Sequence, residues 1–430
     1  MTDMDFYLLN NKKATILIGT LLFIISILIS FPIGMEVNLL SDFTVFWQAG
    51  RNYIDNLPLY SNIGGARRYI YPPFASMCFQ LFAVLSLHQA AIFFSICNCL
   101  FWVMTIDYAR KILLLTSATV KQVNYSLLIG FLLSFRYFLY HLSFVQMNSL
   151  VLLLTLSGIY YFLTKKNNLA ILLLVIATFI KTIPILILIW VLSKSNYKNY
   201  LRTTIYFVLC ILLPILFRGV HQGINDLHDY YTTFLQPFKD GRIEPELQNY
   251  GLAAALFKMF SYTPDGDKYQ YIISTLDSSV IMLIYKCIII FSFLSFLLLL
   301  IYSRFVNKTI SLLEIGFTLM FTHLLSGITW EYHLVTLFFV IPLLFLNFLN
   351  TSPTYKWLYY ILGVFLIFNS IIGADTVGFY LYYKSCGYSL LTWMLLFLEF
   401  YFLFIYLFAK NDKMKLQILN VDPKMTSDHQ

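Results

Sequence analysis

The chain has 430 residues, of which 59% are hydrophobic and only 12% are charged. Soluble domains average about 25% charged residues, so an ordinary water-soluble fold is excluded. The formal net charge is +8, but the basic residues lie in short segments between apolar runs and form no nucleic-acid-binding motif. The composition indicates a polytopic membrane protein with an all-α fold, because a segment inside lipid must satisfy its own backbone hydrogen bonds.

Runs of about 20 apolar residues, the length needed to cross the hydrocarbon core, recur along the chain. The first, residues 14–34, follows two lysines without a small-residue cleavage site, so we expect a retained span rather than a signal peptide. Lys181 and Pro184 interrupt residues 168–192, where we expect two short membrane helices, because proline removes a helical hydrogen bond. The other predicted spans are 89–107, 124–140, 147–163, 200–217, 279–302, 311–329, 332–350, 355–373 and 388–409.

These segments predict about twelve crossings with both termini in the cytoplasm. In that topology 17 of the 29 Lys and Arg residues fall in the shorter, cytoplasmic loops, as the positive-inside rule requires. Residues 1–410 then form one transmembrane domain, and residues 411–430 form a polar cytoplasmic tail. We expect a multi-pass protein of a bacterial plasma membrane.

Two of the predicted loops are long, and both lie outside the cytoplasm. They cover residues 35–88 and 218–278. Within them, residues 72–87 follow a Pro-Pro pair and are too short to cross, so they suit a helix at the membrane surface. Residues 248–262 suit the same description.

Ionisable side chains at membrane depth are costly and usually functional. In the predicted topology they gather on the side away from the cytoplasm, where we expect them to face a cavity. They are Asp42, Arg67, Arg68, Arg136, His141, Lys181, Glu331 and His333.

Each candidate in the first external loop has two interpretations. Asp42 could be a general base, or Ser41 and Asp42 could cap the helix that follows. Arg67 and Arg68 could hold a phosphate through paired hydrogen bonds, or they could contact lipid headgroups.

The candidates in later segments are equally open. Lys181 could meet a substrate anion, or it could form a structural salt bridge or snorkel. Gln146 and Asn148, where an external turn enters a span, could bind substrate or join helices. His333 could donate to a phosphate oxygen or be solvated, and Glu331 could also be solvated. Trp330 suits the interfacial aromatic belt.

Five stretches in order resemble glycosyltransferase family 87, whose members are polyprenol-phosphate-mannose-dependent mannosyltransferases of the C-type glycosyltransferase superfamily. They are SDFTVFWQAGRNYIDNLPLY, YIYPPF, VQMNSLVLLL, FIKTIPILIL and SGITWEYHLVTL. The chain differs from the usual family pattern at two positions where glycine is common. These are Val145, before the Gln-x-Asn motif, and the neighbourhood of Asn56 in the first loop.

The resemblance implies a C-type bundle that transfers a hexose, expected to be mannose, outside the cytoplasm. The donor would be a polyprenyl-phosphate sugar and the acceptor a lipid or glycan. The transfer would invert the anomeric carbon, so that a β-linked donor gives an α-linked product. Asp42 would be the catalytic base, and Lys181 and His333 would face the donor phosphate. The further substrate-binding candidates are Arg67, Arg68, Tyr71, Gln146, Asn148, Trp330 and Glu331.

The residue types suit this chemistry independently. A carboxylate within about 3 Å can take the proton of an attacking hydroxyl. A phosphate leaving group needs cationic donors rather than a protonating acid, so one acid with several cations is a fitting set. No cofactor is expected, and no carboxylate cluster suggests a divalent metal site.

Two other classes remain possible at this stage. A transporter or lipid-linked-sugar flippase would have broken helices in corresponding halves, whereas this chain has one such break, at Lys181. An oligosaccharide polymerase or ligase would not be expected to place its base directly after the first span.

Overall fold

The computed structural model describes the chain as an assembly of helices. The described residues are 12–38, 41–60, 69–239, 243–261, 273–305, 310–350, 356–408 and 416–418. Their only β-type pairing is an isolated bridge between Ser311 and Gln417. The all-α prediction is therefore confirmed for this part of the chain. Arg67, Arg68 and most of the predicted cytoplasmic tail lie outside the described residues.

A helix occupies each of the twelve segments predicted to cross the membrane. These helices are α2 (Lys12–Glu36), α5 (Leu87–Leu113), α6 (Val120–Ser143), α7 (Asn148–Leu163), α8 (Asn167–Ile180), α9 (Ile185–Ser193), α10 (Tyr197–Arg218), α14 (Ser278–Phe305), α15 (Leu312–Leu325), α16 (Leu337–Asn350), α17 (Lys356–Ile371) and α19 (Leu390–Phe408). Among the described residues, six helices are long and apolar enough to span a membrane alone, or seven if one bent pair counts as a span. The number of crossings stays a prediction.

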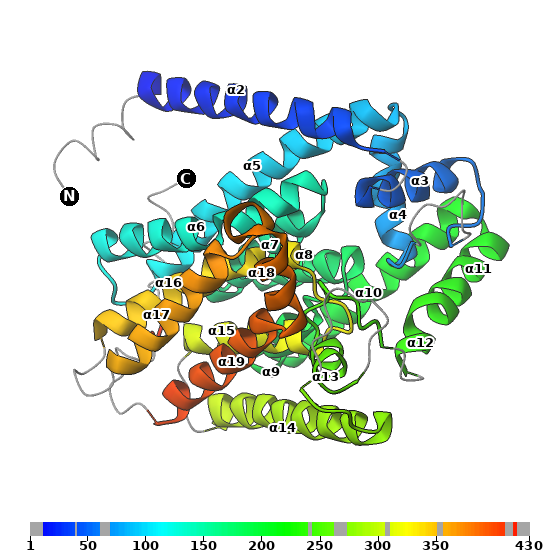
Figure 1. Cartoon of the computed structure of the whole chain (residues 1–430). Helices are drawn as coiled ribbons and strands as arrows, with labels where there is room; N and C mark the ends of the chain where they lie inside the picture. Colours follow the sequence, from blue (N-terminus) through cyan, green and yellow to red (C-terminus); the bar gives the residue numbers. More distant parts are fainter. Residues whose placement is uncertain are drawn as a thin grey trace.

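Both long loops, which the predicted topology puts outside the cytoplasm, contain short helices. The first holds α3 (Asp42–Ile54) and α4 (Pro73–Ala83). The second holds α11 (Val220–Tyr230), the π-helical turn η1 (Tyr231–Leu235), α12 (Gln236–Lys239) and α13 (Leu252–Phe260). In Figure 1, α3, α4, α11 and α12 gather at one end of the bundle, and α2 begins toward the other.

The hydrophobic core is built around α15, which is mostly apolar and is buried on all sides. Of its residues, Leu325 alone is not buried, and a helix that is hydrophobic all round belongs inside a bundle. The helix packs against α19, while α16 packs against α6. Gly130 allows that second approach, because a Cβ there would lie 2.8 Å from the Phe338 carbonyl oxygen.

The membrane segment at residues 168–192 is broken where the sequence predicts. Helix α8 ends at Ile180, and α9 begins at Ile185. Between them Lys181 has an extended backbone (φ −149°, ψ 123°), and Pro184 is the N-cap of α9. A proline suits the start of a helix, where its missing N–H would have no partner. The break leaves Lys181 between two helix ends.

Helix α18 (Ala374–Gly387) is absent from the sequence-based description, which places a loop there. It follows α17 after a sharp bend of 107°. Tyrosines and a lysine make its sequence too polar to register as a span, and Gly378 at φ +78° interrupts its regular geometry. A six-residue 3-10 helix, η2 (Glu331–Thr336), also precedes α16 inside the predicted span 332–350.

Arg218, at the start of the second long loop, ties that loop to the first. Arg218 and Asp226 lie 2.7 Å apart and are both almost fully buried. Arg218 also donates hydrogen bonds to the carbonyl oxygens of Asn52 (2.9 Å) and Leu57 (2.6 Å). These bonds hold the end of α3 against the junction of α10 and α11, and therefore position Asp42 at the other end of α3.

Candidate functional site

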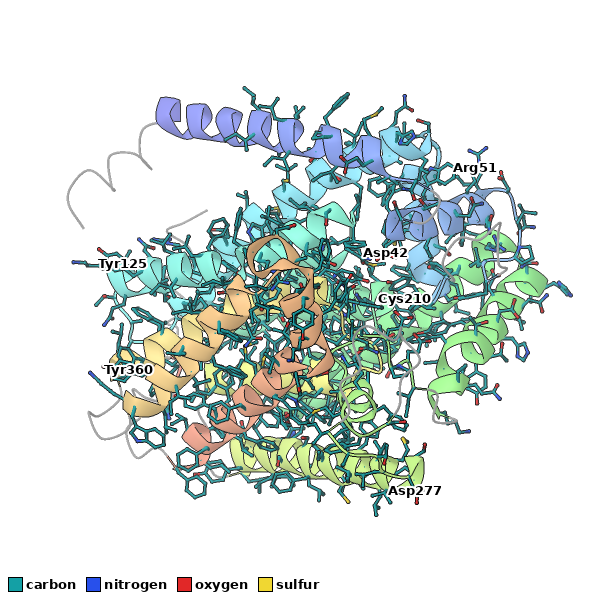
Figure 2. The ribbon with its side chains drawn as sticks, in the orientation of Figure 1. Asp42, Arg51, Tyr125, Cys210, Asp277 and Tyr360 are labelled. Atoms are coloured by element: carbon teal, nitrogen blue, oxygen red, sulfur yellow. The ribbon has the colours of Figure 1, made fainter. Side chains whose placement is uncertain are left out.

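A cavity of about 830 Å³ lies between the helices of the two long loops and the bundle. This volume is in the range of ligand-binding sites. Six of the predicted site residues line it: Asp42, Tyr71, Gln146, Lys181, Trp330 and His333. Figure 2 shows Asp42 toward the end of the bundle that carries Arg51 and Asp277, whereas Tyr125 and Tyr360 lie at the other end.

Asp42 is the first residue of α3 and is 6% exposed. Ser41, rather than Asp42, occupies the N-cap position. The Asp42 Oδ2 atom accepts a hydrogen bond of 2.6 Å from Gln146 Nε2, which comes from the distant turn between α6 and α7. A carboxylate held by an amide at a cavity wall can accept a proton from a bound hydroxyl.

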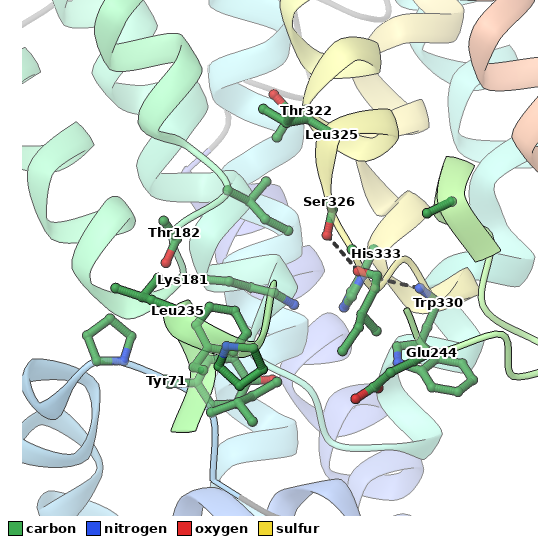
Figure 3. A pocket seen from close by; sticks show the side chains of 18 of the residues that line it. Tyr71, Lys181, Thr182, Leu235, Glu244, Thr322, Leu325, Ser326, Trp330 and His333 are labelled. Atoms are coloured by element: carbon green, nitrogen blue, oxygen red, sulfur yellow. Dashed lines mark hydrogen bonds between the residues drawn. The ribbon is translucent and has the colours of Figure 1, made fainter. Parts of the chain in front are cut away.

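Lys181 reaches the same cavity from the break between α8 and α9. Its Nζ donates a 2.6 Å hydrogen bond to Asn148 Oδ1, and Asn148 Nδ2 donates to the Tyr332 carbonyl oxygen at 3.0 Å. Within the described residues, no carboxylate lies at ion-pairing distance from Nζ. Asn148 does not line this cavity, but its side chain holds the Lys181 ammonium group through the hydrogen bond at Oδ1. The ammonium group points across the cavity toward His333 (Figure 3).

His333 is 7% exposed, so the interpretation of simple solvation is wrong. Its Nδ1 accepts a hydrogen bond of 3.2 Å from the Trp330 backbone N–H. In the neutral ring this leaves the proton on Nε2, which can then donate to an anion. The fold places this imidazole opposite Lys181 (Figure 3).

Tyr71 lies in the same cavity, beside Asp42. Burial raises the pKa of its hydroxyl, and the negative charge of Asp42 raises that pKa further. The hydroxyl therefore remains a hydrogen-bond donor at neutral pH. The ring meets Phe46 edge-on, with 5.0 Å between centroids, and the Tyr71 carbonyl oxygen accepts a 2.6 Å hydrogen bond from Tyr60.

Glu331 does not reach the cavity, and the interpretation that it is solvated is wrong. It is 2% exposed and forms a 2.5 Å ion pair with Arg136. The hydroxyl groups of Tyr250 and Tyr382 donate to its other oxygen at 2.9 and 3.0 Å. Each carboxylate oxygen thus has a partner, and the cluster fixes the segment that presents Trp330 and His333. His141 is buried and also lies away from the cavity lining.

Sequence reasoning gave Asn249 no role, but it holds the second external loop in place. Its Oδ1 accepts from the N–H groups of Gly251 and Thr329, both at 2.9 Å. Its Nδ2 donates to the carbonyl oxygens of Glu244 (2.8 Å) and Gly327 (3.0 Å). All hydrogen-bonding positions of a buried amide are used, so the loop is fixed to the segment before Trp330. The sequence signal that could have indicated this role is a polar residue shortly before the apolar helix α13.

Backbone conformation explains two departures from the family pattern. Asn56 and Val145 have φ values of +55° and +48°. This left-handed region favours glycine, and asparagine tolerates it. A β-branched residue such as Val145 is strained there, at a cost of order 1–3 kcal/mol. The chain therefore keeps the backbone shape of the two turns while replacing glycine.

The far wall of the cavity is apolar. Ile183 and Leu186 line it from the α8–α9 region, Met282 and Tyr285 line it from α14, and Leu325 lines it from α15. The lining therefore combines apolar side chains suited to a hydrocarbon chain with charged side chains, which include Asp42, Lys181, Lys239, Glu244 and Glu246. In the described part of the chain, no group of three or more His, Cys, Asp or Glu side chains could hold a metal ion.

The model of glycosyltransferase family 87 matches residues 69–327, more than half of the chain. Tyr71, Gln146 and Lys181 fall inside the matched range, whereas Asp42 and His333 lie outside it. Searches of curated proteins and of solved structures gave no significant match. The family match confirms the resemblance to this family, and three of the five stretches, YIYPPF, VQMNSLVLLL and FIKTIPILIL, lie inside the matched range. The chain therefore belongs to glycosyltransferase family 87 and is a membrane glycosyltransferase.

Proposed function

We propose that the protein transfers a hexose, most simply mannose, from a polyprenyl-phosphate donor to a lipid or glycan acceptor. The observation that carries the proposal is one cavity whose lining includes carboxylates, cations and apolar side chains. Asp42 and Lys181 line its polar part, and Met282 and Tyr285 line its apolar part. A lipid-linked phosphosugar needs all three surroundings at once.

In the proposed reaction Asp42 is the general base. An acceptor hydroxyl attacks the anomeric carbon, and its proton passes to the Asp42 carboxylate as the new glycosidic bond forms. The bond between the anomeric carbon and the phosphate oxygen breaks, and the electron pair leaves with the polyprenyl phosphate. Attack from the opposite face inverts the anomeric carbon, so a β-linked donor gives an α-linked product.

The donor phosphate would lie between Lys181 and His333. A phosphate is already a good leaving group, so it needs positive charge and hydrogen-bond donors rather than an acid. Lys181 supplies an ammonium group, and His333 supplies the Nε2 proton that remains while Nδ1 accepts from Trp330. The prenyl chain would follow the apolar wall toward α14. The predicted topology places this site on the extracytoplasmic face.

A donor panel tests the proposal. Membranes containing the protein would be incubated with radiolabelled polyprenyl-phosphate mannose, glucose and galactose, and separately with nucleotide sugars. We expect label from a polyprenyl-phosphate sugar, with mannose most active, to enter the lipid or glycan fraction. Membranes that lack the protein are the control. Transfer from a nucleotide sugar alone would contradict the proposed donor class.

A further inference from the structure

A chain of buried hydrogen bonds runs from the bundle interior to Asp42. Ser149 Oγ donates to Asn98 Oδ1 at 2.5 Å, and Asn98 Nδ2 donates to the Gln146 carbonyl oxygen at 2.9 Å. Gln146 Nε2 then donates to Asp42 Oδ2 at 2.6 Å. Ser149 and Asn98 are both fully buried, and neither lines the cavity. Sequence reasoning had given neither residue a role.

The chain of hydrogen bonds passes through a strained turn. Val145, directly before Gln146, is held at φ +48°, where a β-branched side chain is disfavoured. Such a conformation persists only if surrounding contacts fix it. The bond from Asn98 to the Gln146 carbonyl oxygen is such a contact, because it joins this turn to α5. Backbone hydrogen bonds from Val145 N–H to Leu142 (2.9 Å) and from Gln146 N–H to His141 (3.1 Å) close the turn, and the Asn98 bond fixes the Gln146 carbonyl group against α5.

We propose that Asn98, oriented by Ser149, is a positioning residue for the general base. By fixing the Gln146 backbone, it keeps the Gln146 amide on one oxygen of Asp42. The hydrogen bond from Gln146 occupies one carboxylate oxygen of Asp42. It thereby fixes the orientation in which Asp42 receives the proton of the acceptor. This inference rests on the proposed function, because it gives Asn98 a task in transfer through Asp42.

The proposal predicts a particular kinetic pattern for Asn98→Ala. A small misplacement of a catalytic group can lower a rate by about 10²-fold, so kcat should fall about 10- to 100-fold. The KM for the donor should change less than about twofold, since Lys181 and His333 are untouched.

The experiment measures initial rates over a range of donor concentrations, with radiolabelled polyprenyl-phosphate mannose and membranes carrying each variant. Ser95→Ala is the matched control, because Ser95 is fully buried on the same helix and its Oγ has no hydrogen-bond partner among the described residues. It should behave as wild type. Ser149→Ala leaves Asn98 Oδ1 without its donor and should show the same pattern more weakly. If Asn98→Ala does not fold, the same measurements on Ser149→Ala test the proposal.

The outcomes separate this inference from the proposed function. Wild-type protein that transfers no sugar from any lipid-phosphate donor would end both. Active wild type, an inactive Asp42→Asn variant, and an Asn98→Ala variant with normal kcat would overturn the positioning role alone. A fall in the amount of folded protein, with kcat per folded molecule unchanged, would also overturn it in favour of a purely structural role.

Discussion

Replacing Asp42 with asparagine is expected to lower the rate of sugar transfer by roughly 10²–10⁴-fold, the usual contribution of a general base. Asparagine has nearly the same shape, and its amide oxygen can still accept the hydrogen bond from Gln146 Nε2. Folding and donor binding should therefore survive, because Lys181 and His333 are unchanged. The measurement is the initial rate of label transfer at saturating donor, together with the thermal stability of the purified variant.

Asp55→Asn is the matched control for this prediction. Asp55 follows the last residue of α3, and its side chain is 42% exposed while it pairs with Arg51. Surface ion pairs of this kind contribute about 0–1 kcal/mol, so the variant should transfer sugar normally. Near-normal transfer by Asp42→Asn would remove the assignment of the base.

Replacing Lys181 with alanine is expected to weaken donor binding as well as turnover. A hydrogen bond to a charged group is worth about 1.5–3 kcal/mol, so the KM for the donor should rise roughly 10- to 100-fold. The kcat should fall too, because the leaving phosphate gains charge during the reaction. Steady-state kinetics with polyprenyl-phosphate mannose measure both quantities.

A second substitution separates lost charge from lost packing at this position. Lys181→Met keeps most of the buried side-chain volume but has no ammonium group, so it should match the alanine variant in kinetics and exceed it in stability. Lys111→Met is the control, since that lysine forms an exposed pair with Asp107. If Lys181→Met keeps a normal KM, the lysine does not hold the donor phosphate.

Local sequence signals account for much of the helical frame. Apolar runs mark the bundle helices because lipid requires continuous hydrophobic surfaces. Lys181 and Pro184 mark the break between α8 and α9 because a charge and a missing N–H both disfavour an unbroken membrane helix. Helix α18 was not predicted, because its tyrosines and lysine give it a composition typical of a loop. It nevertheless packs against α13 and α19.

The site could be predicted as a set of residue types but not as a set of partners. The motifs placed Asp42, Gln146, Lys181 and His333 at one face, and all four line the cavity. Glu331 pairs with Arg136, which lies 195 residues earlier in the chain, so no local sequence pattern predicts this contact. The same is true of Asn98, whose role is visible only when α5 and the turn before α7 are seen together.

The most direct test of the account is the configuration of the product. Purified protein in lipid vesicles would receive β-linked polyprenyl-phosphate mannose and a membrane acceptor fraction, and the new linkage would be assigned by nuclear magnetic resonance. The account predicts an α-linked product that is lost in the Asp42→Asn variant. A β-linked product would contradict direct displacement with Asp42 as base. Movement of the labelled lipid across the vesicle membrane without a new glycosidic bond would point instead to a flippase.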